Sequence, residues 1–175
     1  ALALLWAAMA RAPLTLETEM LPIAQARGRV LATDIRSPGP IPEFRRSTVD
    51  GFALRAADTG AGQVLPVAGE IPMGVFRTQA LPSGAAIKIH TGGHVPEGAD
   101  AVIMVERTTE LPNGQIRLDE TLSPGDNVIQ IAEDVQPGSV VISAGAILRE
   151  QEIAGLASLG ISQAPVRRRP RVALI

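Results

Sequence analysis

Apolar residues recur at helical spacing in three parts of the chain. Near its start, four side chains follow the i, i+3, i+4, i+7 pattern of an amphipathic helix: Leu2, Leu5, Trp6 and Met9. No basic segment precedes this run, and it is too short to span a membrane, so we expect a packed helix rather than a targeting segment. A second helix is predicted over residues 149–159 and a short one over 22–26, each closed by a glycine.

From residue 44 to residue 135 the pattern changes to short strand-like stretches at close spacing. Strands are expected over residues 52–55, 63–70, 85–90, 101–106, 115–118 and 127–131, with Gly- and Pro-containing turn signals between them. The Pro112-Asn113-Gly114 turn predicts a hairpin between the strands at 101–106 and 115–118. Regular strands with no intervening helix are typical of a small β-barrel or sandwich.

The two ends of the chain combine helices with strands, the latter expected over residues 29–35, 140–142 and 164–166. Three prolines within residues 37–42 predict an extended linker, where we place a domain boundary. The expected fold is therefore mixed α/β and β. Residues 1–43 plus 136–168 form a discontinuous α/β linker and dimerisation domain, and residues 44–135 form an inserted β-barrel-like domain.

The last residues of the chain predict a further domain. The run at 172–175 is wholly apolar, as in a first strand buried on both faces of a parallel sheet, and no partner strand follows it. We therefore expect residues 169–175 to begin an α/β domain that is missing from this sequence, and the lack of an initiator Met suggests trimming at the start as well.

Composition removes several classes of function. The net charge is −2 and aromatic residues make up 2% of the chain, which disfavours binding to nucleic acid or an anionic membrane. The basic stretch at 167–171 is better explained as a charged connector. With no cysteine, disulfides, thiolate metal sites and cysteine nucleophiles are excluded, which agrees with a cytoplasmic location.

Two glycine-flanked loops carry the candidate chemistry. Asp50-Gly51 joins a polar segment containing Ser47 to an apolar one; alone it is more typical of a turn than of an anion or metal site. Thr91 follows a predicted strand and is followed by Gly92 and Gly93, whose backbone amides are candidates for binding an oxyanion.

Two further sets of residues are weaker candidates. His90 and His94 lie on a strand and a loop rather than on one helical face, which disfavours a metal pair. Glu133 and Asp134 are adjacent carboxylates at the edge of the β-rich region, where solvated surface is the simpler explanation.

In order and spacing, these segments resemble the molybdopterin molybdenumtransferase family, bacterial MoeA and its eukaryotic relative gephyrin. The matching stretches are 28–32, 47–53, 67–70, 89–102, 133–135, 159–161 and 169–174, with the Thr91 stretch the most specific. One difference is that the family often has Gly before the Glu-Asp pair, with basic residues upstream, where this chain has Ala132 preceded by Ile129, Gln130 and Ile131.

The resemblance implies an enzyme that inserts molybdenum from molybdate into molybdopterin, hydrolysing an adenylylated intermediate with Mg²⁺. It implies an elongated cytoplasmic homodimer in which the molybdopterin-binding domain of one subunit faces the β-rich domain of the other. Asp50, Thr91 and Asp134 match catalytic positions, with Asp50 and Asp134 placed to hold the cation; Ser47, Gly92 and Gly93 would contact substrate. The alternative is a non-catalytic dimerisation or interaction module. Neither nucleic acid nor membrane is an expected partner.

Overall fold

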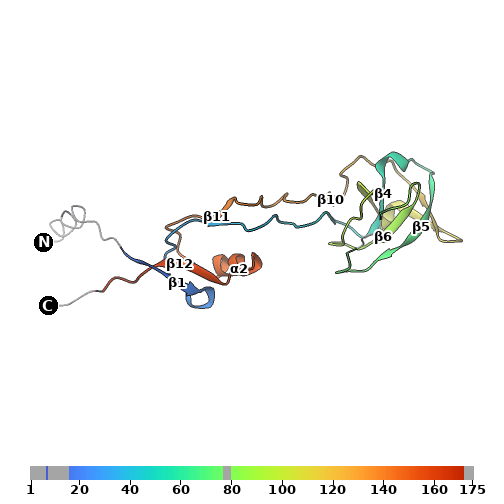
Figure 1. The fold of residues 1–175 in the computed structure, drawn as a ribbon. Helices are drawn as coiled ribbons and strands as arrows, with labels where there is room; N and C mark the ends of the chain where they lie inside the picture. Colours follow the sequence, from blue (N-terminus) through green and yellow to red (C-terminus); the bar gives the residue numbers. More distant parts are fainter. Residues whose placement is uncertain (1–6, 8–15, 77–79, 172–175) are drawn as a thin grey trace. The chain divides into compact units, whose positions relative to one another are not determined.

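The computed structural model describes residues 16–76 and 80–171, together with Ala7. The helix expected over residues 2–9, apart from Ala7, and the strand expected over 172–175 lie outside this range. The described chain divides into two compact units (Figure 1). Unit 2 is Pro40–Gln136, and unit 1 is made of the described residues on either side, up to Gly39 and from Pro137 onward.

Unit 2 contains a six-stranded sheet with the order β7-β4-β6-β5-β9-β8. Its strands are β4 (Gly51–Leu54), β5 (Val64–Ile71), β6 (Ala86–Ile89), β7 (Ala101–Met104), β8 (Thr108–Leu111) and β9 (Gln115–Leu118). Only β5 and β6 run parallel; the other neighbours are antiparallel. The edge strands β7 and β8 are not paired with each other in the described sheet, so it stays open as half a barrel.

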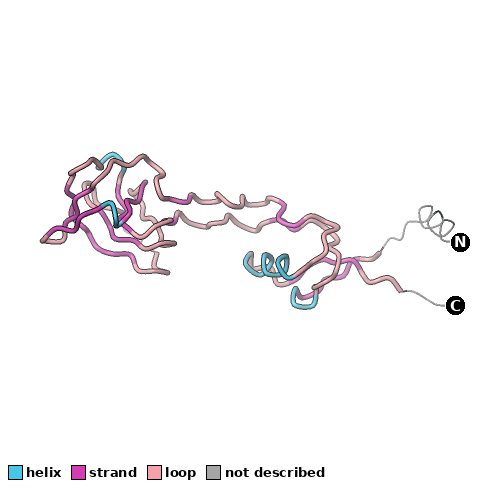
Figure 2. The backbone as a smooth tube through the Cα atoms, turned by 180° about the vertical axis from the view of Figure 1, so that it is seen from behind, coloured by secondary structure: helices cyan, strands magenta, loops and turns pink. Residues whose placement is uncertain are grey.

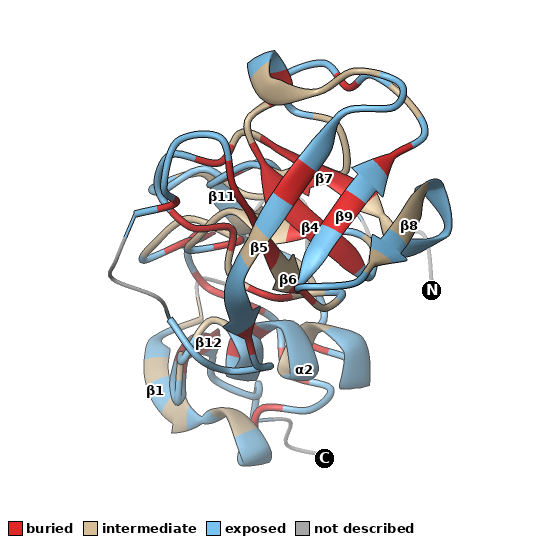
Figure 3. Ribbon diagram, turned by 90° about the vertical axis from the view of Figure 1, so that its right-hand side faces the viewer, coloured by how far each residue is buried: buried red, intermediate tan, exposed pale blue. Residues whose placement is uncertain are grey.

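Apolar side chains on both faces of this sheet are buried, which explains why β4 and β7 are buried along almost their whole length (Figure 3). Alternate residues of β4 point to opposite faces, so Phe52 and Leu54 belong to one core cluster and Ala53 to the other. Loops cover the second face, contributing Leu81, Val95 and Ala99, among others. The sheet is therefore a packed core that fixes the loops at its ends.

The smaller elements of unit 2 attach the loops to this sheet. Strands β3 (Arg46–Ser47) and β10 (Val128–Ile129) pair with each other outside it. Three-residue 3-10 turns, η2 (Ala56–Asp58) and η3 (Val105–Arg107), follow β4 and β7. Together these short elements carry the chain between strands without any α-helix among the described residues of unit 2.

The hairpin predicted at Pro112-Asn113-Gly114 forms, but the first strand of this hairpin is not the one expected. Its partner is β8, which pairs with β9 residue by residue from Thr108↔Leu118 to Leu111↔Gln115. The expected strand at 101–106 stops at Met104, because the chain turns through η3, and β7 pairs with β4 instead. The polar sequence of β8 gave no apolar signal for a strand.

Unit 1 contains the only α-helix longer than one turn among the described residues, α2 (Glu150–Ser158) (Figure 2). Two antiparallel pairs accompany it: β1 (Thr18–Pro22) with β12 (Gln163–Arg167), and β2 (Ile35–Arg36) with β11 (Val140–Ile142). The 3-10 turn η1 (Ile23–Gln25) occupies the short helix expected at 22–26. These elements share one buried cluster: Ala26, Leu31, Ile35, Leu148, Leu156, Ala164 and Val166.

The strand expected over residues 29–35 was only partly correct, since regular pairing is confined to β2 and to isolated bridges at Val30 and Leu31. The fold class is confirmed: a β-rich unit is inserted into a discontinuous unit that combines strands with helix. Within the described residues, no helix has the length and apolar character needed to cross a bilayer.

Candidate functional site

The two loops singled out in the sequence are hydrogen-bonded to each other. Oδ1 of Asp50 accepts a hydrogen bond from the backbone N–H of Thr91 at 2.8 Å and another from its Oγ1 hydroxyl at 3.1 Å. Asp50 directly precedes β4 and Thr91 follows β6 by two residues. Since β4 and β6 are neighbours with Gly51 opposite Ile89, the sheet itself brings the two loops together.

Glycine is required on both sides of this contact. A Cβ on Gly51 would lie 1.9 Å from the carbonyl oxygen of Ile103, and one on Gly93 would lie 2.7 Å from that of His90. Gly92 has a φ of +77°, a left-handed conformation that side chains disfavour. Gly51 and Gly93 therefore leave no room for a side chain, and Gly92 is favoured by its backbone conformation.

The amides expected to bind an oxyanion have partners within the protein. Gly92 N–H donates to the Ser47 carbonyl at 2.8 Å, and Gly93 N–H donates to the His90 carbonyl at 2.8 Å. Ser47 is itself 1% exposed, and its hydroxyl donates to the Val49 carbonyl at 2.6 Å. In this conformation Ser47, Gly92 and Gly93 hold the loop together through hydrogen bonds within the protein. Their contact with substrate stays a prediction.

Asp50 is exposed and keeps its negative charge. The two hydrogen bonds from Thr91, first the backbone and then the side-chain one, lower the pKa of the Asp50 carboxyl, with nearby His90 adding a smaller effect. Oδ2 accepts no hydrogen bond from any described residue. One carboxylate oxygen is thus held by the loop while the other is available.

Sequence reasoning missed the pairing of His90 with Glu70. Nε2 of His90 lies 2.7 Å from Oε1 of Glu70, and Nδ1 lies 3.9 Å from Oδ1 of Asp50. Hydrogen bonding to His90, followed by the charge of Lys88, lowers the pKa of Glu70. The only available signal was that Glu70 and His90 end two predicted strands, since the parallel pairing of these strands is not visible in the sequence.

His94 has different neighbours from His90. Its ring lies 5.7 Å from that of Phe44 and 5.2 Å from that of Phe76, between centroids. Burial, with a smaller contribution from Arg45, lowers the pKa of His94, which favours the neutral ring. The two imidazoles therefore have separate partners.

Asp134 lies against Arg46, with Oδ2 at 3.6 Å from the guanidinium Nη2. Within residues 16–76 and 80–171, no cluster of three or more His, Cys, Asp or Glu side chains is arranged to hold a metal ion. Mg²⁺ is often bound through one or two carboxylates completed by water and substrate phosphates. Asp50, with Oδ2 available, fits such a site, whereas Asp134 already has a cationic partner.

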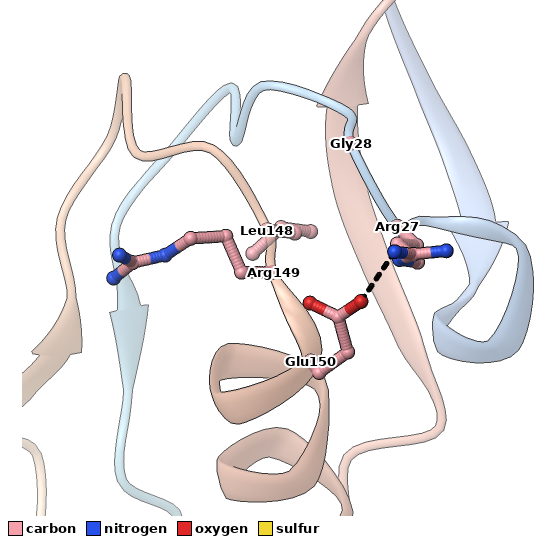
Figure 4. Close-up of a pocket in the computed structure, with 5 residues that line it drawn as sticks. All are labelled: Arg27, Gly28, Leu148, Arg149 and Glu150. Atoms are coloured by element: carbon pink, nitrogen blue, oxygen red, sulfur yellow. Dashed lines mark ion pairs between the residues drawn. The ribbon is translucent and has the colours of Figure 1, made fainter.

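A cavity of about 400 Å³ in unit 1 is lined by Arg27, Gly28, Leu148, Arg149 and Glu150 (Figure 4). Its charged side chains are already paired. Arg27 contacts Glu150 at 2.5 Å, as the dashed line in Figure 4 marks, and Arg149 contacts Glu152 at 2.7 Å. It contains none of the candidate catalytic, substrate-binding or metal-binding residues predicted from the sequence.

Comparison with known proteins finds molybdopterin molybdenumtransferases among the relatives of this chain. The chain is 39% identical to the molybdopterin molybdenumtransferase of Haemophilus influenzae and 38% identical to that of Bacillus subtilis. The alignments cover 93% and 91% of this chain but 40% and 39% of those proteins, so the chain spans about two fifths of their length.

Crystal structures agree with this result. A molybdopterin biosynthesis MoeA protein from Pyrococcus horikoshii matches with a TM-score of 0.83 at 42% identity, over 88% of this chain and 42% of that one. Another crystal structure of a molybdopterin biosynthesis MoeA protein from Pyrococcus horikoshii matches with a TM-score of 0.87 at 33% identity, over 94% of this chain and 43% of that one. Residues 1–160 match the family described as the MoeA N-terminal region (domain I and II), and the chain belongs to that family.

Proposed function

We propose that this chain is part of a molybdopterin molybdenumtransferase and forms one wall of its active site. The observation that carries the proposal is the hydrogen-bonded contact between Asp50 and Thr91, which joins the two most specific segments of the sequence at an exposed position. Family membership and the activity named for the relatives support the same reaction. In that reaction molybdenum from molybdate is inserted into molybdopterin, which is supplied in adenylylated form.

The residue types suit a reaction between anions. Molybdate and a phosphate-linked pterin repel each other, and a divalent cation such as Mg²⁺ would neutralise part of this charge. Asp50 is the residue best placed to orient such a cation through Oδ2, because Thr91 already holds Oδ1. Thr91 acts mainly by fixing this carboxylate. Asp134 is proposed as a second acidic group, which Arg46 would have to release.

We further propose that the protein acts in the cytoplasm as a homodimer. The opposite wall of the active site, which binds molybdopterin, would come from the partner subunit. A protein limited to the present chain should therefore not bind the two substrates productively, and it should not complete the reaction.

The test uses the full-length protein with Asp50→Ala or Thr91→Ala. Asp50→Ala removes both hydrogen bonds, whereas Thr91→Ala removes the hydroxyl donor and keeps the backbone N–H. Each should lower the rate of molybdenum insertion at least about 100-fold, as loss of a preorganised polar group commonly does. Light scattering should show an intact dimer in both. Asp119→Ala and Thr121→Ala are matched controls at exposed positions of the same unit and should keep normal activity.

Normal insertion activity in either site variant would contradict the site assignment. A wild-type protein that dimerises but inserts no molybdenum would instead support a non-catalytic dimerisation module.

A further inference from the structure

Glu70, His90 and Asp50 form a row across three neighbouring strands. In the sheet, β6 lies between β4 and β5 (Figure 1). Asp50 precedes β4, His90 follows β6, and Glu70 is the residue before the end of β5. Ile89 pairs with Gly51 on one side and with Ile71 on the other, so the three side chains emerge at the same end of these strands.

Glu70 determines how the His90 ring is held. A carboxylate only accepts hydrogen bonds, so at 2.7 Å the Nε2 atom must carry the proton and donate it. This contact fixes the orientation of the ring, in the way that an outer carboxylate orients a functional histidine in many sites. The ring then presents Nδ1 to Asp50.

The Asp50 carboxylate is confined from two sides. Thr91 binds Oδ1 through two donors, and the Nδ1 edge of His90 lies 3.9 Å from the same atom. Asp50 and Glu70 are both exposed, so close packing does not hold them. Their order depends on the polar contacts in this row.

We propose that Glu70 and His90 are positioning residues for Asp50. Glu70 holds the His90 ring beside the Asp50 carboxylate, and the ring keeps that carboxylate in the rotamer in which Oδ1 binds Thr91 and Oδ2 is available. The consequence for molybdenum insertion rests on the proposed function, whereas the effect on the Asp50–Thr91 contact does not.

The first experiment measures that contact directly. Hydrogen exchange of the Thr91 amide is followed by NMR in the protein carrying this chain, as wild type and with Glu70→Ala, His90→Phe or both. His90→Phe keeps a planar ring and removes both nitrogens. We expect the Thr91 amide to exchange about tenfold faster in each single variant, and the double variant to match them, because the residues act through one linkage. Glu110→Ala, an exposed carboxylate on β8, is the control and should leave the amide unchanged.

The second experiment measures molybdenum insertion by the full-length variants. We expect kcat to fall about tenfold with the KM for molybdate unchanged, as when an orienting residue is lost. An unaltered Thr91 amide in both single variants would overturn the positioning role whatever the activity. A faster amide with normal kcat would overturn its importance for the reaction. If the wild type inserts no molybdenum, the proposed function fails and the Thr91 amide alone decides the positioning role.

Discussion

Gly51 is the residue at which the sheet of unit 2 leaves no room for a side chain. A Cβ there would lie 1.9 Å from the Ile103 carbonyl oxygen, and backbone atoms of neighbouring strands cannot move apart independently. Gly51→Ala should therefore lower the free energy of unfolding by about 3 kcal/mol or more. Denaturant titration provides the measurement. Gly60→Ala is the control, because a Cβ at Gly60 meets no atom within 4 Å, and it should change stability little.

Ala132 adopts a conformation that normally favours glycine, with φ of +61°. The resemblance described above leads us to expect Gly at this position in many relatives. Replacing it with Gly relieves left-handed strain but loses a buried methyl group and adds chain entropy to the unfolded state. These effects nearly cancel, so Ala132→Gly should change the free energy of unfolding by less than about 0.5 kcal/mol.

A β-branched side chain at the same position has no such compensation. Ala132→Val should destabilise the protein by about 2 kcal/mol, measured in the same denaturant titration. Equal stabilities of the Gly and Val variants would show that the left-handed conformation at Ala132 is not maintained in solution.

Single residues show where sequence reasoning succeeds and where it stops. The Asp-Gly and Thr-Gly-Gly patterns were enough to single out Asp50 and Thr91, which are in contact. The same patterns could not show that the amide of Gly92 is already hydrogen-bonded, because its partner, the carbonyl of Ser47, is distant in sequence. Local composition identifies a loop, while its hydrogen-bond partners depend on the fold.

Helix α2 begins with a reciprocal contact between Arg149 and Glu152. The Arg149 N–H donates to Oε2 at 2.9 Å, and its guanidinium donates to Oε1 at 2.7 Å. These bonds, the side-chain one first, lower the pKa of Glu152 from 4.5 to about 2. Because the folded-state pKa is depressed, this contact stabilises the helix fully above about pH 4.5 and is lost as pH falls toward 2.

Carboxyl NMR titration of Glu152 checks this prediction. The wild-type signal should titrate near pH 2, and Arg149→Gln should return it toward the ordinary value of 4.5. Arg27→Gln is the control, since Arg27 pairs with Glu150 rather than with Glu152. A Glu152 midpoint that Arg149→Gln leaves unchanged would rule out this contact as the cause.

Elements were predictable to the extent that they are apolar. The buried strands β4 and β6, and β9 with its alternation of exposed and buried residues, lie within one residue or so of the expected stretches. By contrast, β8 is an edge strand and β1 belongs to a two-stranded pair. Both are partly exposed and have polar sequences, so nothing in their local pattern distinguishes them from loops. The parallel pairing of β5 with β6, which places Glu70 beside His90, also leaves no local signature.

Unit 2 has the features of a domain that folds without the rest of the chain. Its two ends are tied together, because Ile41 N–H donates to the Val135 carbonyl at 2.9 Å and Val135 N–H donates back at 3.0 Å. Both core clusters of the six-stranded sheet consist of residues between Val49 and Val128. An insertion whose ends meet and whose core is its own needs no other segment to bury its apolar surface.

A protein consisting of residues 40–136 should therefore fold cooperatively. Its amide NMR spectrum should be dispersed, and the Thr91 amide should keep the protection given by Asp50, since every strand that positions the contact is retained. Ile41→Pro removes one of the two hydrogen bonds that tie the ends and should lower the free energy of unfolding by about 1 kcal/mol or more. A collapsed spectrum without dispersion would show that unit 2 depends on unit 1. With a folded unit 2, the Asp50–Thr91 contact would be a property of the inserted unit alone, and it could be studied separately from unit 1.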